Sequence, residues 1–201
     1  ISRWQASLRP DRVVGVHINM VTAGPPPDVE DPNAGIPAEE LERTQARQEF
    51  FADERGYSNL QGTKPQTLGF GLNDSPAGLA AWIVEKFMTW CDCGDHVENE
   101  FTKDELLTNI TIYWVTGTIT SSTRIYYESR YTPSSRPIGY IETPVGCAIF
   151  PHEIFIPPRA WAEAAYNVTH WTEMPRGGHF AALEQPELLT DDIRAFFREL
   201  R

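Results

Sequence analysis

The chain has 201 residues, of which 17 are basic and 28 acidic, so its formal net charge is −11. Its 41% of hydrophobic and 22% of charged residues are typical of a folded globular protein and exclude wholesale disorder. The excess of acidic residues argues against a nucleic-acid-binding protein, and no apolar run approaches the roughly 20 residues that a membrane span requires.

The three cysteines are too few for a framework of disulfides. Cys91 and Cys93 form a C-x-C pair instead of a C-x-x-C, and Cys147 lies in an apolar stretch, so we predict no metal site. We expect a reducing, cytoplasmic environment. The sequence starts at Ile1 without an initiator methionine or a signal-peptide pattern, so we expect it to begin partway through a longer protein.

A helix, a strand and a linker follow one another at the start of the chain. Residues 1–9 resemble the end of a helix, and the β-branched run at 13–18 is typical of a buried strand. Five prolines and two glycines at 23–37 predict a linker. A helical pattern then extends over 38–55, with Gly56 as its predicted end.

The middle of the chain predicts an all-helical block. After a stretch at 57–72 that we expect to be irregular, a serine–proline pair at 75–76 opens a helix with apolar residues at helical spacing. Thr102 and Glu105 have the spacing of a capping box and open a second helix. A third helix is predicted at 121–129. No alternating strand pattern separates these helices.

The last third of the chain has a different pattern, in which strands and helices alternate. Strands are predicted at 145–150 and 168–172, with a short helix at 158–166 between them and an amphipathic helix at 186–200. The fold class is therefore α/β: half of an open sheet with a helical lid inserted between two of its strands.

This organisation divides the chain into three segments. Residues 1–22 and 134–201 are predicted to form the sheet-containing core, and residues 23–133 are predicted to form a linker and a helical cap.

Two residues are candidates for catalysis, because functional side chains of open α/β sheets lie beyond the carboxyl ends of strands. Glu153 follows the strand predicted at 145–150, and His179 lies in the turn RGGHF after the last strand. A carboxylate that orients a histidine is half of a catalytic triad, and the order acid then histidine is that of α/β-hydrolases. Plainer interpretations remain: Glu153 as a solvated loop residue, and His179 as a capping or core histidine. Of the other histidines, His152 is a rival, and His17, inside a strand, is more often structural.

The sequence contains no recognisable nucleophile. There is no G-x-S-x-G motif and no cysteine at a strand–turn–helix elbow. An aspartate nucleophile would also need an elbow after a strand, and in this fold the elbow is expected just before the helix that Ile1 continues.

Four stretches of the chain contain more specific motifs. They are 16–20 (VHINM), 56–90 (with TKP, then NDSPAGLAAWI), 101–129, and 174–197 (with RGGHF), and together they span nearly the whole chain. They resemble microsomal-type epoxide hydrolases, which are α/β-hydrolases with a helical cap. The resemblance implies that this chain is the C-terminal half including the cap, and that the oxyanion loop and an aspartate nucleophile in a G-G-D-W-G-like elbow lie upstream.

The resemblance also implies the roles of four residues. His179 is implied as the general base and Glu153 as its acidic partner, while Tyr57 and Tyr126 match the cap tyrosines that hold the epoxide oxygen. Tyr127 is the alternative to Tyr126. The implied reaction opens an epoxide to a vicinal diol through an aspartate ester, which water activated by the histidine and the glutamate hydrolyses, without a metal or cofactor.

Two rival functions remain open at this point. One is another capped α/β-hydrolase, such as a haloalkane dehalogenase or an esterase, which the paired tyrosines disfavour. The other is a non-catalytic fragment or binding module. The expected partners are a small apolar epoxide, the missing N-terminal half and a second copy in a homodimer, with neither nucleic acid nor a membrane span. By itself the chain is expected to be inactive and, with an exposed strand edge at 13–18, prone to association.

Overall fold

The computed structural model describes residues 1–27, 29–132 and 138–201. It forms two compact units, Ile1–Phe51 with Arg136–Arg201, and Ala52–Ser135. Residues 23–51, which the sequence pattern groups with the linker and cap, lie in the first unit. The predicted boundary at 133–134 lies outside the described residues.

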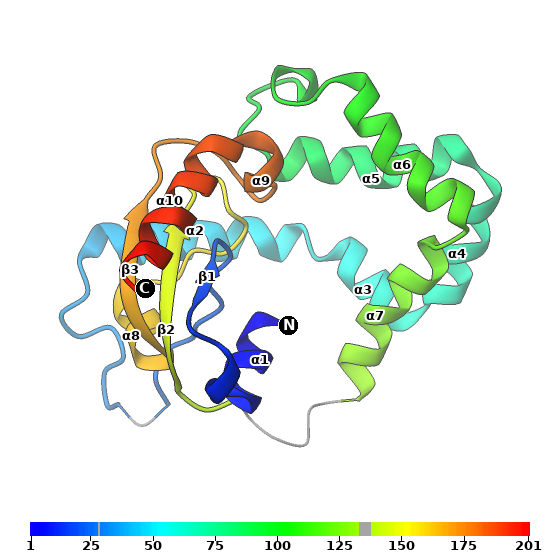
Figure 1. Ribbon diagram of the computed structural model, residues 1–201. Helices are drawn as coiled ribbons and strands as arrows, with labels where there is room; N and C mark the ends of the chain where they lie inside the picture. The colour runs from blue at the N-terminus through cyan, green and yellow to red at the C-terminus, as the bar shows by residue number, and fades with distance from the viewer. Residues whose placement is uncertain (28, 133–137) are drawn as a thin grey trace. The chain divides into compact units, whose positions relative to one another are not determined.

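The first unit contains a parallel sheet in the order β1-β2-β3 (Figure 1). Its strands are β1 Val16–Ile18, β2 Ile141–Ile149 and β3 Tyr166–Glu173. His17 pairs with Gly146, which lies opposite His170 on the other side. Because the strands are parallel, their carboxyl ends lie at the same end of the sheet, where the loops after β2 and β3 come together.

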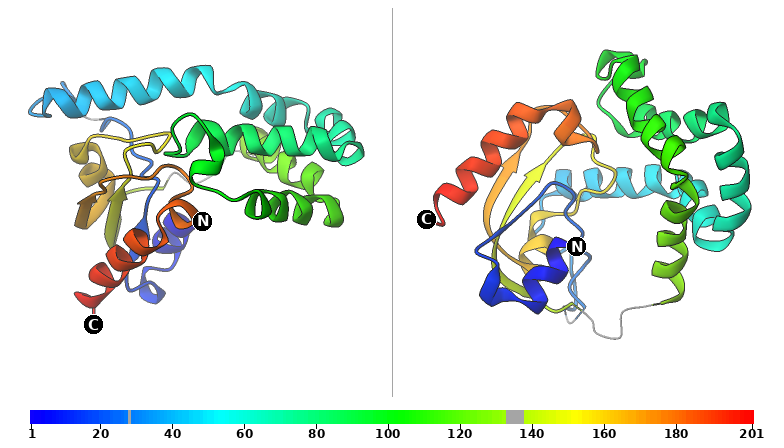
Figure 2. Two further views of the ribbon diagram at one scale, coloured as in Figure 1. Left: turned by 90° about the horizontal axis from the view of Figure 1, so that it is seen from above. Right: turned by 45° about the vertical axis from the view of Figure 1, so that its right-hand side comes forward.

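Helices cover both faces of this sheet. One face packs against α1 (Ser2–Leu8) and α8 (Arg159–Ala165), and the other against α9 (Ala181–Glu184) and α10 (Pro186–Arg198). The unit also contains η1 (Pro10–Arg12) and most of α2 (Ala38–Asp53). In β2, Val145 and Cys147 belong to a core cluster with residues of α1 and α8, whereas Ala148 packs with residues of α9 and α10. From Val145 to Ile149 the strand is therefore buried on both faces, which explains why this stretch has no polar side chain. Figure 2 shows α10 along one face.

A buried polar cluster joins α10 to the sheet. Asp192 accepts hydrogen bonds from Thr172 Oγ1 (2.6 Å) and lies 2.7 Å from His17 Nε2 and 2.8 Å from His170 Nε2. Burial alone would raise the pKa of Asp192, but these hydrogen bonds outweigh it and lower the pKa below its usual value. Gly146 leaves room for this packing, because a Cβ there would lie 2.9 Å from the Phe196 ring.

The second unit is helical, as predicted. After the end of α2 it contains α3 (Gly56–Thr63), α4 (Pro65–Asp74), α5 (Pro76–Trp90), η2 (Val97–Asn99), α6 (Lys103–Thr116) and α7 (Ile119–Tyr131). The predicted caps are present: Ser75 accepts from the Gly78 N–H at 3.0 Å, and Thr102 and Glu105 form the capping box. Helix α6 runs alongside α5 (Figure 2).

The prediction of an irregular stretch at 57–72 is wrong, because these residues form most of α3 and α4. Three glycines lower the helix propensity of the segment, and tertiary packing outweighs them. At Gly69 a Cβ would overlap the side chain of Thr120 on α7, so the glycine that weakens the helical pattern allows α4 and α7 to approach.

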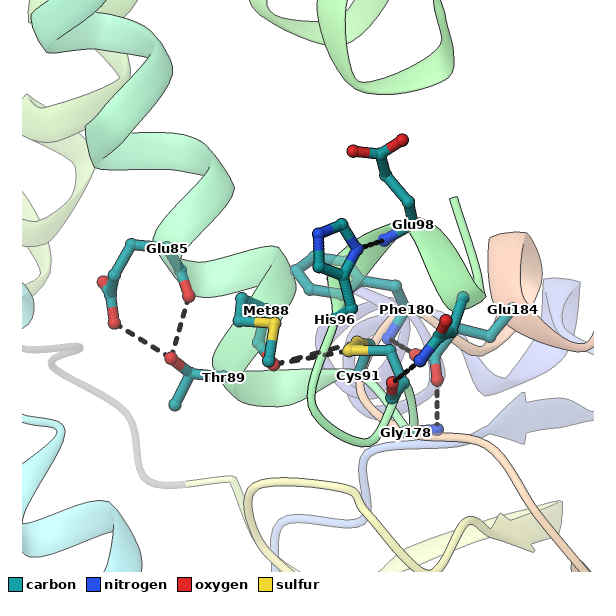
Figure 3. Close-up of a disulfide and its surroundings, with 11 residues drawn as sticks. Glu85, Met88, Thr89, Cys91, His96, Glu98, Gly178, Phe180 and Glu184 are labelled. Atoms are coloured by element: carbon teal, nitrogen blue, oxygen red, sulfur yellow. Dashed lines mark hydrogen bonds between the residues drawn. A yellow bond between two sulfur atoms is a disulfide. The ribbon is translucent and has the colours of Figure 1, made fainter. Parts of the chain in front are cut away.

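The structure pairs Cys91 and Cys93 in a disulfide, directly after α5 (Figure 3). The cysteine count did not predict this bond. Cys147 is free and buried, and burial raises the pKa of its thiol to about 12. Within the described ranges, no group of His, Cys, Asp or Glu residues could hold a metal ion, and no helix is long and apolar enough to cross a membrane.

Candidate active site

The side chains of Glu153 and His179 meet beyond the carboxyl ends of β2 and β3. Glu153 lies four residues beyond Ile149, the end of β2, and His179 lies six beyond Glu173, the end of β3. His179 Nδ1 is 2.7 Å from Glu153 Oε1. The backbones of the two loops also pair, because the His152 N–H donates to the Gly177 carbonyl at 3.1 Å.

Glu153 is enclosed by protein. The residue is 1% exposed, and its Oε1 accepts a second hydrogen bond from the backbone N–H of Ile154 at 2.7 Å. No hydrogen-bond partner for Oε2 occurs among residues 1–27, 29–132 and 138–201. Because Glu153 is buried, the plainer interpretation of it as a solvated loop residue does not hold. A carboxylate in this position needs charged or hydrogen-bonded neighbours.

Arg47 on α2 binds the backbone of the loop that contains Glu153. Its Nε donates to the carbonyl of Glu153 at 2.8 Å, and its Nη2 donates to the carbonyl of His152 at 3.1 Å. Burial lowers the pKa of Arg47, and the charge of Glu153 opposes this shift. The guanidinium therefore places a positive charge near the buried carboxylate and restrains the loop that presents it.

The turn RGGHF orients His179. Gly177 has φ +105°, a region that favours glycine, and a Cβ there would also lie 2.7 Å from the Phe150 ring. The imidazole side chain is 24% exposed. Because an ionised carboxylate only accepts hydrogen bonds, Nδ1 bears the proton toward Glu153, and proton transfer to or from a substrate falls to Nε2.

The rival histidines take other positions. The side chain of His152 is exposed, whereas the adjacent Glu153 is buried. His17 lies on β1, in the polar cluster around Asp192.

In the second unit, the structure brings Tyr57 on α3 together with Tyr126 on α7. Their rings are 5.7 Å apart, edge to face at 79°. Burial, a hydrogen bond with Tyr126 and the nearby charge of Glu54 raise the pKa of Tyr57 above its usual value, so its phenol stays protonated at neutral pH. Tyr127 instead packs against Tyr131, with ring centroids 4.6 Å apart. Of the two candidates for the second tyrosine, Tyr126 is the one beside Tyr57.

Two residues of the site escaped the sequence analysis, Arg47 and Glu184. Arg47 lies more than a hundred positions from Glu153 and has no local motif. Glu184 follows His179 by five residues, and its carboxylate accepts hydrogen bonds from the backbone N–H groups of the residues before and after His179. No local motif marks Glu184 either, because its partners are backbone amides.

A parallel sheet with an acid after one strand and a histidine after the next is the C-terminal part of an α/β-hydrolase fold. No protein-family model matches the chain. Epoxide hydrolase 1 of Sus scrofa is 47% identical to it over 153 residues, 71% of this chain and 34% of that protein. Juvenile hormone epoxide hydrolase 2 of Ctenocephalides felis is 48% identical over 156 residues, 72% of this chain and 34% of that protein.

Among solved structures, juvenile hormone epoxide hydrolase from the silkworm Bombyx mori matches with a TM-score of 0.86 and 30% identity. The match covers 99% of this chain and 52% of that one. The chain belongs to the epoxide hydrolases of the α/β-hydrolase fold, which confirms the resemblance. It spans about half, or less, of the length of these relatives.

Proposed function

We propose that this chain supplies the acid, the histidine and the tyrosines of an epoxide hydrolase that converts a small apolar epoxide to a vicinal diol. The observation that supports it is the 2.7 Å contact between buried Glu153 and His179 in a chain homologous to epoxide hydrolases. The paired tyrosines favour this reaction over the ester or haloalkane hydrolysis of other capped α/β-hydrolases.

In the first half-reaction a carboxylate attacks one carbon of the epoxide and the C–O bond breaks. The developing alkoxide is a poor leaving group, so it needs hydrogen-bond donors. Tyr57 and Tyr126 are the proposed donors, because neutral phenols donate without bringing a charge into an apolar site. The attacking carboxylate is proposed to be an aspartate upstream of Ile1, and the product of this step is an ester.

In the second half-reaction water hydrolyses the ester. His179 Nε2 takes a proton from the water as the water oxygen attacks the ester carbonyl, and Glu153 at Nδ1 stabilises the imidazolium that forms. The acyl C–O bond then breaks, the imidazolium returns its proton to the departing alkoxide to give the diol, and the aspartate carboxylate is regenerated. The buried position of Glu153 strengthens this stabilisation, because water screens the pair less than it would at the surface.

The test uses the enzyme expressed with the coding sequence that precedes Ile1. His179→Gln should form the ester and fail to hydrolyse it, so intact-protein mass spectrometry should show the mass of one substrate added and retained. His152→Gln is the matched control, because it makes the same substitution at an exposed histidine next to Glu153. This variant should turn over the epoxide at the normal rate.

Two results would overturn the proposal. The first is normal diol formation by His179→Gln. The second is a wild-type enzyme that hydrolyses esters or haloalkanes but no epoxide, which would favour the rival hydrolases. We also expect the 201 residues by themselves to form no diol, because the nucleophile proposed here is not among them.

A further inference from the structure

Glu184, the last residue of α9, holds the turn that presents His179. Its Oε2 accepts the backbone N–H of Gly178 at 2.8 Å, and its Oε1 accepts the backbone N–H of Phe180 at 2.8 Å. Figure 3 shows this carboxylate between the two amides. The amides belong to the residues immediately before and after His179, so one side chain restrains the backbone on both sides of the histidine.

Because Glu184 is buried, its carboxylate depends on these two hydrogen bonds. The residue is 7% exposed, and a carboxylate removed from water must be compensated by strong donors. Backbone N–H groups that donate to a carboxylate form charge-assisted hydrogen bonds, which are shorter and stronger than those between neutral groups. The turn after β3 is therefore fixed by two hydrogen bonds to a buried carboxylate, in addition to the conformation of Gly177.

The acid on the other side of the pair has little freedom to adjust. Glu153 Oε1 is bound to the Ile154 N–H, and the carbonyl of Glu153 is bound to Arg47. If the backbone at His179 moved, the Glu153 carboxylate could not follow it. The 2.7 Å distance between His179 Nδ1 and Glu153 Oε1 therefore depends on the turn that Glu184 restrains.

We propose that Glu184 is a positioning residue that sets the orientation and the tautomer of His179 through the flanking backbone. The kinetic part of this inference rests on the proposed function. Loss of the restraint should slow the histidine-dependent hydrolysis of the ester by about 10- to 100-fold, since misplacement of a catalytic group by about 1 Å can cost that much. It should leave the formation of the ester, which does not use His179, unchanged.

The decisive variant is Glu184→Gln in the enzyme expressed with its upstream sequence. Glutamine has nearly the same shape, but it offers one acceptor oxygen and one NH₂ group, which would face one of the two amides as a second donor. Glu187→Gln is the matched control, because Glu187 is exposed and lies three residues further along. Glu184→Asp retains the charge on a shorter stem and serves if Glu184→Gln does not fold.

The first measurement requires no substrate. In ¹⁵N-labelled protein, the ring of His179 should show a protonated Nδ1 with the low-field proton signal of a hydrogen bond to a carboxylate. Glu184→Gln, or Glu184→Asp in its place, should weaken or abolish this signal, and Glu187→Gln should retain it. The second measurement is single-turnover mass spectrometry, in which the Glu184 variant should accumulate ester that Glu187→Gln does not.

The outcomes separate the two proposals. A Glu184 variant that keeps the Nδ1 signal overturns the inference, even if its melting temperature is lower, because a merely structural role predicts only that. A variant that loses the signal but hydrolyses its ester at the wild-type rate overturns the kinetic part of the inference. If the wild-type enzyme forms no diol, the proposed function fails, and the Nδ1 signal still decides whether Glu184 positions His179.

Discussion

Glu153 Oε1 lies 2.7 Å from His179 Nδ1, although 26 residues separate them in the chain. The distance is short because each residue follows one of two neighbouring parallel strands, β2 and β3, whose loops also pair through their backbones. Glu153 is buried, its carboxylate is bound to the Ile154 N–H, and its backbone carbonyl is bound to Arg47. The pair is therefore organised before any substrate binds. Preorganisation of this kind lowers the cost of forming a charged imidazolium.

The negative charge of Glu153, and not only its shape, should matter for turnover. Glu153→Gln preserves the volume and one acceptor oxygen but removes the charge that stabilises the imidazolium. In the full-length enzyme we expect ester hydrolysis to slow by about 100-fold or more, with the formation of the ester little changed. Single-turnover kinetics followed by mass spectrometry measures both steps. A variant that hydrolyses its ester at the wild-type rate would contradict the role of Glu153.

Tyr57→Phe should have the opposite kinetic effect. Removing a positioned donor should slow the formation of the ester by about 10- to 1,000-fold, so no adduct accumulates. Tyr126→Phe should behave in the same way, whereas Tyr127→Phe is the matched control, since Tyr127 packs on Tyr131. An effect of Tyr127→Phe larger than that of Tyr126→Phe would reverse the assignment.

The pH dependence of the first half-reaction follows from the raised pKa of Tyr57. A phenol with a raised pKa keeps its proton to higher pH than an ordinary tyrosine, whose pKa is about 10. The rate of ester formation should therefore not fall as the pH rises toward 10, as long as the protein stays folded. A decline centred below pH 10 that Tyr57→Phe removes would show that the phenol ionises more easily than its surroundings indicate.

Asp192 should stabilise the fold in a pH-dependent way. Because its pKa is lower in the folded protein than its usual value of about 3.9, its contribution is fully present above that pH and is lost as the pH falls through the folded pKa. Asp192→Asn should lower the free energy of unfolding by about 1–3 kcal/mol at neutral pH, and the deficit should shrink below about pH 4. Asp191→Asn is the control, because its side chain is 77% exposed. Denaturant unfolding at several pH values provides the comparison, and a deficit that does not change with pH would contradict the ionic role.

Thiol labelling should distinguish the three cysteines. The native protein should react little, since Cys147 is buried and Cys91 and Cys93 are paired. After denaturation without a reductant, only Cys147 should react, and reduction should expose the other two. Three reactive thiols in the denatured, unreduced protein would show that the disulfide is absent in solution.

The sequence alone determined the features that depend on neighbouring residues. The helix caps at Ser75 and Thr102 need only a side chain and the first turn that follows it, and the apolar run that ends at Phe150 predicts a strand buried on both faces. The order of Glu153 and His179 after successive strands was also predictable, because parallel strands place their carboxyl ends together. For the same reason, the α/β fold class could be read from the alternation of strands and helices.

Only the tertiary structure decided the rest, because it depends on contacts between residues far apart in the chain. Helix α4 forms against its glycine-rich sequence because Gly69 fits closely against Thr120. The choice of Tyr126 over Tyr127 depends on which face of α7 meets α3, a matter of about 100° of rotation around the helix. Arg47 and Glu184 act on peptide groups, which every residue possesses, so no side-chain motif marks their partners. A sequence can specify which groups are available, but the distances that turn a carboxylate and an imidazole into a working pair are set by how the strands and loops pack.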